Sequence, residues 1–155
     1  MESINEFRGK YKVFSNFYES PVEYEGITYR NSEAAFQSAK IHIPNNMEYT
    51  NLLRVKEGFS LMSPLEAKRK GRRIKLRTDW EVVKDEVMYN ILLNKFSRDK
   101  NLLKILLETG EKELIEGNTW HDNYWGNCNC IKCKNIQGKN KLGKLLMMVR
   151  KELSK

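Results

Sequence analysis

The chain of 155 residues is long enough to bury one core, and its 40% hydrophobic and 31% charged residues indicate a globular protein. Only nine glycines and three prolines occur, and no apolar run approaches the roughly 20 residues of a membrane span, which excludes low-complexity and membrane-spanning classes. The formal net charge of +8 favours anionic partners such as phosphates, nucleotides or nucleic acid, although a basic surface serves solubility equally well.

The N-terminal part of the chain predicts a β-hairpin followed by a helix. Residues 21–30 form two short alternating runs on either side of Glu25-Gly26, which is typical of two strands joined by a turn. Asn31 or Ser32 then caps a helix that extends to Lys40.

Four further helix signals follow along the chain. Ser63–Glu66 is a capping box with proline at the first helical position, and this helix is predicted to stop at Gly71. Thr78–Glu81 is a second capping box and opens a strongly periodic helix. Another helix is predicted over about 99–107, and Asn140 is predicted to cap the last one.

No internal repeat and no linker interrupts these elements. We therefore predict a mainly α (α+β) fold. It would be a single compact helical domain over residues 1–155 with a small N-terminal β-hairpin.

Four chemically different side chains share one face of the predicted helix at residues 31–40. A carboxylate, a ring, an amide and an amine line up at helical spacing, namely Glu33, Phe36, Gln37 and Lys40. The opposite face carries only small residues, whereas an ordinary surface helix turns bulky apolar groups inward. The face is therefore predicted to point into a pocket, and the alternative is an ordinary helix with a Glu33–Lys40 pair in solvent.

Two segments combine aromatic rings with polar groups. The loop Glu116–Gly126 contains Trp120, Trp125 and Asp122, which suit stacking of a flat heterocycle and proton transfer or cation stabilisation. The alternative is a loop whose Trp side chains only fill the core. Ser15–Tyr18 repeats the theme with an amide beside two rings, but propensity alone favours a strand edge with core aromatics.

Two weaker patterns occur near the C-terminus. Gly138–Gly143 precedes a helix, where backbone N–H groups can face a phosphate. Its spacing matches neither a Walker loop nor a dinucleotide fingerprint, so a plain loop is favoured. Three cysteines and a histidine lie close together in the sequence and could bind zinc. Structural zinc sites usually have two separated ligand pairs, however, so a metal-free loop is favoured. That ligand set would be Cys128, Cys130, Cys133 and His121.

Short sequence blocks in one order from Ile4 to Leu153 carry a family resemblance. They are Phe7–Tyr18, Tyr24–Tyr29, Ser32–Gln37 with Lys40, Ala67-Lys68, Gly71-Arg72, Arg77–Glu81, Val87-Met88, Lys95-Phe96, Thr109-Gly110, Leu114–Trp120, Asp122–Gly126, Gly138–Gly143 and Leu146–Arg150. Together they resemble the NADAR superfamily, small domains linked to NAD and ADP-ribose metabolism that include N-glycosidases of riboflavin-pathway intermediates. One segment departs from the pattern: many members have a short Gly-rich loop where this chain has Cys130–Cys133.

The resemblance implies hydrolysis of the bond between ribose C1 and an exocyclic amine nitrogen. It implies two substrate classes: phosphoribosylamino-pyrimidine intermediates of riboflavin synthesis, and ADP-ribosyl groups on guanine, either in small molecules or in DNA or RNA. Candidate residues for stacking the base or holding the phosphate and ribose are Arg8, Asn16, Phe17, Tyr18, Gln37, Trp80, Trp125, Gly126 and Asn140. Arg30, Arg72 and Arg77 are further phosphate candidates.

Cleavage of such a bond builds positive charge on the sugar. A carboxylate stabilises this charge and activates water, while an acid protonates the leaving nitrogen. We expect Glu33 in the first role and Asp122 in the second, or the reverse, with a raised pKa for the acid beside Trp80 and Trp125. An alternative route uses Lys40 as an amine that captures C1 as a Schiff base, which requires a lowered pKa.

Two other functions stay open at this stage. A non-catalytic module could bind ADP-ribose or nucleotides, and a basic domain could bind nucleic acid with strongly salt-dependent affinity. The chemistry requires no cofactor. Residues 1–8 lack the apolar core of a signal peptide, so we expect a cytoplasmic location, no membrane partner and reduced thiols.

Overall fold

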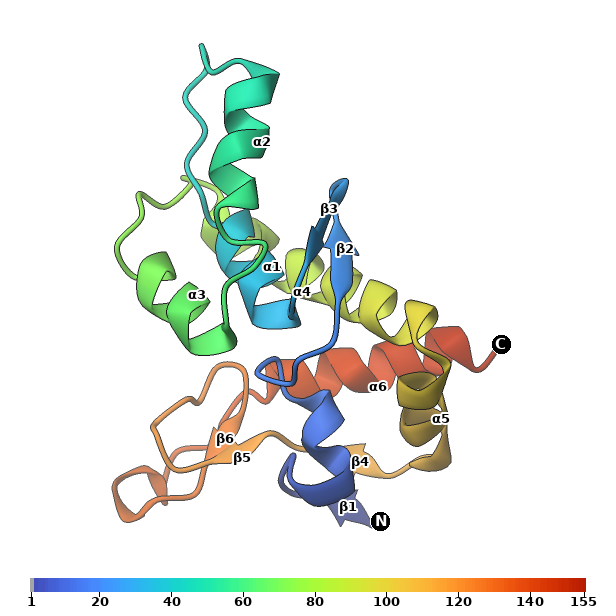
Figure 1. The fold of residues 1–155 in the computed structure, drawn as a ribbon. Helices are drawn as coiled ribbons and strands as arrows, with labels where there is room; N and C mark the ends of the chain where they lie inside the picture. The colour runs from blue at the N-terminus through green and yellow to red at the C-terminus, as the bar shows by residue number, and fades with distance from the viewer. Residues whose placement is uncertain (1) are drawn as a thin grey trace. The chain divides into compact units, whose positions relative to one another are not determined.

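The computed structural model describes residues 2–155, whose internal contacts group them into two compact units (Figure 1). The central unit comprises residues 16–98. The terminal unit comprises residues 2–15 together with 99–155. Helices dominate both units and strands are short, so the predicted mainly α (α+β) class is confirmed.

The central unit begins with the predicted hairpin. Strands β2 (Val22–Tyr24) and β3 (Ile27–Tyr29) pair antiparallel, with Val22 opposite Tyr29. The turn between them places Glu25 at φ 49° and Gly26 at φ 84°. Two left-handed residues in succession match the twist of a tight hairpin, and glycine tolerates this conformation without steric cost.

Helix α1 (Ser32–Ala39) follows directly and is buried along its whole length. The Asn31 side chain accepts a hydrogen bond from the Ala34 backbone N–H at 2.8 Å, which confirms the predicted cap. Its small residues allow neighbouring helices to approach closely, and α1 packs against both α3 (Pro64–Gly71) and α4 (Trp80–Arg98). Figure 1 shows α1 at the centre of this group of helices.

The remaining central helices match the sequence signals with one omission. Helix α3 starts with the predicted capping box, in which the Ser63 and Glu66 side chains each bond the other's backbone, and it ends at Gly71. Helix α4 packs on strand β2. Helix α2 (Tyr49–Glu57) was not predicted, because its N-cap residue Glu48 makes no side-chain cap bond and only Lys56 is buried.

The terminal unit combines short helices with pairs of two-residue strands. Strand β1 (Ser3–Ile4) pairs parallel with β4 (Glu113–Leu114), and β5 (Gly117–Asn118) pairs parallel with β6 (Asn127–Cys128). Strands of two residues are too short to show alternation in a sequence, so they were not predicted. The helices are the 3-10 helices η1 (Gly9–Phe14) and η2 (Ile131–Cys133) and the α-helices α5 (Lys100–Glu108) and α6 (Lys141–Leu153).

Asn140 stands where the last helix begins, as predicted, but its side chain does not cap the helix. Its backbone is left-handed at φ 50°. The side chain instead accepts a hydrogen bond from Glu116 N at 3.0 Å and donates one to Leu114 O at 2.9 Å. The predicted position of the cap residue is therefore right, but the predicted side-chain cap bond is not formed, because the amide bonds the backbone of the β4–β5 segment.

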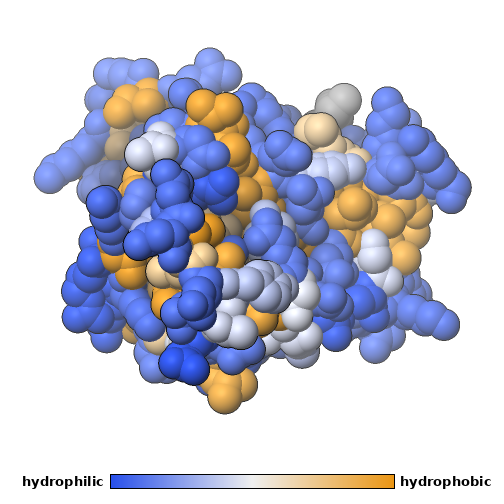
Figure 2. Space-filling view, turned by 90° about the horizontal axis from the view of Figure 1, so that it is seen from above, coloured by the Kyte–Doolittle hydropathy of each residue, from blue (hydrophilic) through white to orange (hydrophobic). Residues whose placement is uncertain are grey.

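The surface agrees with the basic, polar composition. On the face seen in Figure 2, hydrophilic residues surround separate hydrophobic patches. Across residues 2–155, none of the helices combines the length and apolar character that crossing a bilayer requires.

Candidate functional site

The chemically diverse face of α1 lies inside the central unit rather than in open solvent. Glu33 is 7% exposed and Gln37 is 4% exposed. Gln37 Nε2 donates a hydrogen bond to Glu33 Oε1 at 2.8 Å, and Glu33 N donates to Asn16 O at 3.2 Å. A buried carboxylate held by an amide has a defined orientation, which is what a catalytic or binding group needs.

Gly71, the last residue of α3, makes room for this pair. A Cβ atom at this position would lie 1.8 Å from Gln37 Oε1 and 2.6 Å from Gln37 Cδ. Gln37 Oε1 itself is a buried acceptor without a hydrogen-bond donor among residues 2–155. Close approach of the α3 backbone therefore fixes the Gln37 amide, and with it the Glu33 carboxylate.

Lys40 follows α1 as its C-cap residue and is partly buried. Burial lowers the pKa of Lys40; the charge of Glu33 opposes this effect, and the nearby cations Lys68 and Arg72 add to it. Lys40 Nζ also lies 5.5 Å from the centre of the Phe36 ring. A lysine in such surroundings holds more neutral amine at a given pH than a solvated lysine does.

An aromatic and amide segment adjoins the start of α1. Phe17 is 43% exposed, and Lys68 Nζ lies 5.5 Å from its ring centre. Asn16 donates a hydrogen bond to Met88 Sδ at 3.5 Å, while its Oδ1 is buried without a donor among residues 2–155. Because Asn16 O also accepts from Glu33 N, the backbone of this segment is bonded to the first turn of α1.

The other two central aromatic candidates are less exposed than Phe17. Trp80 is 5% exposed and packs against Phe36, with ring centres 5.0 Å apart. Tyr18 lies near Lys95, whose Nζ is 5.9 Å from its ring centre. Trp80 therefore packs against α1 through the ring of Phe36.

The arginine candidates differ in how they are held. Arg77 binds Asp79 through two hydrogen bonds of 2.6 and 2.9 Å, and this pairing raises the pKa of Arg77. Arg30 bonds Glu19 and the Leu61 carbonyl. In the terminal unit, Arg8 is largely exposed and forms an ion pair with Glu6 at 3.5 Å. Arg72 stands directly after Gly71, and its charge contributes to the lowered pKa of Lys40. Arg77 is bonded directly to the end of α1, because its backbone N–H donates to Lys40 O at 2.8 Å and its Nη1 donates to Ala39 O at 3.4 Å.

Asp122 belongs to the terminal unit, in the loop between β5 and β6. Its Oδ1 accepts hydrogen bonds from Tyr124 N at 3.1 Å and Trp125 N at 2.9 Å. Asn118 holds the same loop, because it accepts from Asp122 N and donates to Asp122 O. One carboxylate oxygen thus shapes the turn that carries Trp125.

The remaining candidates of the terminal unit lie around this loop. The Trp125 ring contacts Tyr124 edge-on, with centres 4.9 Å apart. The Gly126 carbonyl accepts from Asn140 N at 3.1 Å, and Trp125 O accepts from Leu142 N at 2.9 Å. These backbone bonds join the loop to the first residues of α6.

The four possible metal ligands converge in the same loop region. The nearest ligand atoms of His121, Cys128, Cys130 and Cys133 all lie within 4.8 Å of one another. All three cysteines are free thiols. The possible zinc ligands, which the sequence alone did not favour as a site, therefore lie close enough together to bind one ion.

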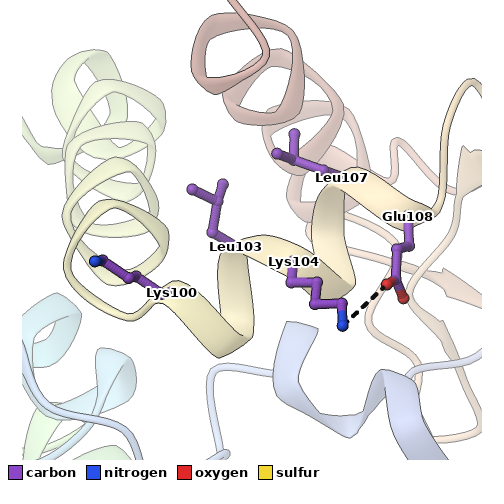
Figure 3. Close-up of a pocket in the computed structure, with 5 residues that line it drawn as sticks. All are labelled: Lys100, Leu103, Lys104, Leu107 and Glu108. Carbon is purple, nitrogen blue, oxygen red and sulfur yellow. Dashed lines mark ion pairs between the residues drawn. The ribbon is translucent and has the colours of Figure 1, made fainter.

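An open cavity lies elsewhere, on one face of α5 in the terminal unit (Figure 3). It has a volume of about 420 Å³. Its lining is apolar at Leu103 and Leu107 and charged at Lys104 and Glu108, which form an ion pair at 3.9 Å. None of the predicted site residues lines it, and its open shape offers no enclosed groups for bond cleavage.

Lys95 is a buried basic residue that sequence reasoning missed as a site candidate. It is fully buried on α4, and burial lowers its pKa to about 7. Its Nζ lies 5.4 Å from the centre of the Phe96 ring. The available signal was its position four residues after Ile91 and three after Leu92, on the apolar face of a periodic helix.

Replacement of Lys95 by methionine is expected to change how stability depends on pH. Between pH 7 and about 10.5, the unfolded state binds a proton at Lys95 that the folded state lacks, so the free energy of unfolding rises with pH. From pH 7 to pH 9, the free energy of unfolding measured with urea should rise by about 2 kcal/mol more in the wild type than in Lys95→Met. This figure follows from ~1.4 kcal/mol per pKa unit. An identical pH dependence in both proteins would contradict the lowered pKa.

Comparison with known proteins places this fold and these blocks in one family. The family model described as "NADAR domain" matches residues 5–154. The chain is 38% identical over 146 residues to N-glycosidase YbiA of Escherichia coli (strain K12), covering 93% of this chain and 82% of that protein. It is 32% identical over 152 residues to the chloroplastic riboflavin biosynthesis protein PYRR of Zea mays, covering 91% of this chain and 23% of that protein.

A solved structure agrees with the sequence matches. The NMR structure of the E. coli protein YbiA superimposes with a TM-score of 0.79 at 33% identity, covering 99% of this chain and 85% of that chain. The α+β architecture and the ordered blocks define a small NADAR-type domain. The chain belongs to the NADAR domain family, which confirms the resemblance found in the sequence.

Proposed function

We propose that the chain, a hydrolase of N-glycosyl bonds like its relatives named N-glycosidase, cleaves ribosylamine intermediates of riboflavin synthesis through the α1 cluster. The observation that carries this proposal is the buried Glu33–Gln37 pair beside Lys40. We assign catalysis to Glu33 and Lys40. The substrate class is supported by the maize relative, whose name places it in riboflavin biosynthesis.

The surroundings of the cluster suit a phosphorylated ribose joined to a flat base. Lys68 and Arg72 supply positive charge around Lys40, and a guanidinium binds phosphate well through two parallel hydrogen bonds. Phe17, exposed and close to Lys68, offers a ring on which a pyrimidine can stack. Asn16 and Gln37 stay predictions as partners of the sugar hydroxyls, since their Oδ1 and Oε1 acceptors are shielded from solvent in this structure.

The proposed reaction begins with opening of the ribosylamine. The exocyclic nitrogen pushes electrons toward C1, the bond from C1 to the ring oxygen breaks, and that oxygen takes a proton. Neutral Lys40 Nζ then adds to C1, and the base leaves as a free amine after gaining a proton. This exchange leaves C1 bound to Lys40 as a Schiff base.

Water completes the cycle. It adds to C1, the bond to Nζ breaks, and the sugar phosphate and Lys40 are released, so that the net reaction consumes one water. Glu33 moves protons in both halves, which explains why a carboxylate must lie beside the amine. If Lys40 serves only to pair with Glu33, the carboxylate instead stabilises the sugar cation and activates water directly.

Asp122 and the terminal-unit residues Arg8, Trp125, Gly126 and Asn140 stay predictions for leaving-group protonation and substrate binding. Asp122 Oδ1 already serves the loop turn. We therefore expect Asp122→Asn to affect the loop as well as turnover, which makes it a less decisive variant than one at Glu33.

ADP-ribose on guanine is the second candidate substrate, because it presents the same bond between C1 and an exocyclic nitrogen and the chain carries a net charge of +8. Parallel assays with a ribosylamino-pyrimidine phosphate and a guanine-ADP-ribosylated oligonucleotide distinguish the two. We expect turnover of the pyrimidine. Turnover of the oligonucleotide alone would indicate that ADP-ribosylated nucleic acid is the substrate. Turnover of neither substrate, together with ADP-ribose binding measured by calorimetry, would indicate a non-catalytic binding protein.

A further inference from the structure

We propose that His121, Cys128, Cys130 and Cys133 form a structural zinc site in the terminal unit. This goes beyond the proposed function and does not depend on it. Structural zinc takes four Cys or His ligands in a tetrahedron, and three thiols with one imidazole are a common set. The sequence supplies them as H-x6-C-x-C-x2-C.

The distances agree with a tetrahedron around one ion. His121 Nδ1 lies 3.4 Å from Cys133 Sγ, 3.4 Å from Cys130 Sγ and 3.9 Å from Cys128 Sγ. Bond lengths of ~2.3 Å to sulfur and ~2.0 Å to nitrogen, at tetrahedral angles, separate a nitrogen and a sulfur ligand by about 3.5 Å. The observed separations scatter around this value, and all four atoms lie within 4.8 Å of one another.

Local structure explains how one loop brings two ligand pairs together. Cys130 and Cys133 flank the turn of η2, where Cys133 N donates to Cys130 O at 3.1 Å. Cys128 ends β6, and its N–H donates to Asn123 Oδ1 at 2.9 Å. The C-x2-C pair has the spacing of a ligand pair in known zinc sites.

His121 completes the set from the other side of the loop. Its backbone is left-handed at φ 68°, an unfavourable conformation for a residue with a Cβ. Asn118 holds the backbone on both sides of it, because Asn118 Oδ1 accepts from Trp120 N and from Asp122 N. The loop thus maintains a strained residue whose imidazole faces three thiols.

Four protein ligands close the coordination sphere, so the ion would be structural rather than catalytic. Cys128 and Cys133 are buried, whereas His121 is exposed, which places the ion near the surface of the loop. Soft thiolates favour zinc over magnesium or calcium. The ion would fix the segment that also carries Asp122 and Trp125.

Metal content and spectroscopy test the site without reference to activity. Protein purified under reducing conditions should hold one zinc per chain, and its removal should lower the melting temperature by roughly 10 °C. Co²⁺ added to the zinc-free wild type should give the intense absorption of tetrahedral thiolate-bound cobalt. His121→Ala and Cys130→Ser should lose zinc, whereas His42→Ala, at the chain's other histidine, should retain it.

Three results would overturn the proposal. One is less than about 0.1 zinc per chain with a Co²⁺ spectrum typical of octahedral oxygen ligands. Another is a disulfide among these cysteines in protein purified under reducing conditions, shown by mass spectrometry. The third is full zinc content in both His121→Ala and Cys130→Ser. Because the cobalt measurement uses the wild-type chain, it remains decisive if a variant fails to fold.

Discussion

Glu33→Gln is expected to lower kcat by about 1,000-fold while the fold is preserved. Proton transfer by a positioned side chain contributes about 10²–10⁴-fold to a rate, and glutamine cannot exchange a proton at neutral pH. The substitution keeps size and shape, and its carbonyl oxygen can still accept the hydrogen bond that Gln37 Nε2 gives at 2.8 Å. Substrate affinity should therefore change far less than turnover.

Glu23→Gln provides the matched control for this variant. Glu23 is an exposed carboxylate on β2 in the same unit, so its loss removes one negative charge without touching the α1 cluster. Steady-state kinetics on the ribosylamino-pyrimidine phosphate should show Glu23→Gln close to wild type. Comparable rates in Glu33→Gln and wild type would remove Glu33 from the mechanism.

Lys40→Arg is expected to abolish measurable turnover. Arginine keeps the positive charge beside Glu33, but its guanidinium stays protonated and cannot form a Schiff base. Wild-type Lys40 has a pKa lowered chiefly by burial and also by Lys68 and Arg72, which favours the neutral amine that the reaction needs. A pure ion-pair role would allow arginine to retain part of the activity.

The control for Lys40→Arg is Lys75→Arg, an exposed lysine of the same unit. Lys75→Arg should keep wild-type kinetics, and both variants should unfold at similar denaturant concentrations. Retention of a substantial rate in Lys40→Arg would favour direct hydrolysis through Glu33. In that case the lysine would act only as the partner of the carboxylate.

Local sequence signals predicted the elements whose chemistry is confined to a few neighbouring residues. The Glu25-Gly26 turn, the Asn31 cap and the Ser63–Glu66 capping box all satisfy backbone groups within three or four positions, so each is visible in the sequence. Asn140 shows the limit of this reasoning. Its amide bonds Leu114 and Glu116, more than 20 residues away, and no local pattern indicates such a partner.

The same limit applies to the candidate site. Helical spacing correctly aligned Glu33 with Gln37, because that pair lies within one turn of a helix. The contact of Gly71 with Gln37 and the burial of Lys95 depend on packing between helices, which sequence alone does not give. The sequence does not show the two separated ligand pairs that are usual for structural zinc, whereas the folded loop brings His121 within 4.8 Å of the three thiols.

Trapping of the covalent intermediate tests the central claim most directly. Wild-type protein would be incubated with the ribosylamino-pyrimidine phosphate, treated with borohydride, digested and analysed by mass spectrometry. We predict a reduced sugar-phosphate adduct on Lys40 that is absent from Lys40→Arg. Full turnover of the substrate with no adduct on any lysine, in a reaction that Lys40→Arg also completes, would contradict the account.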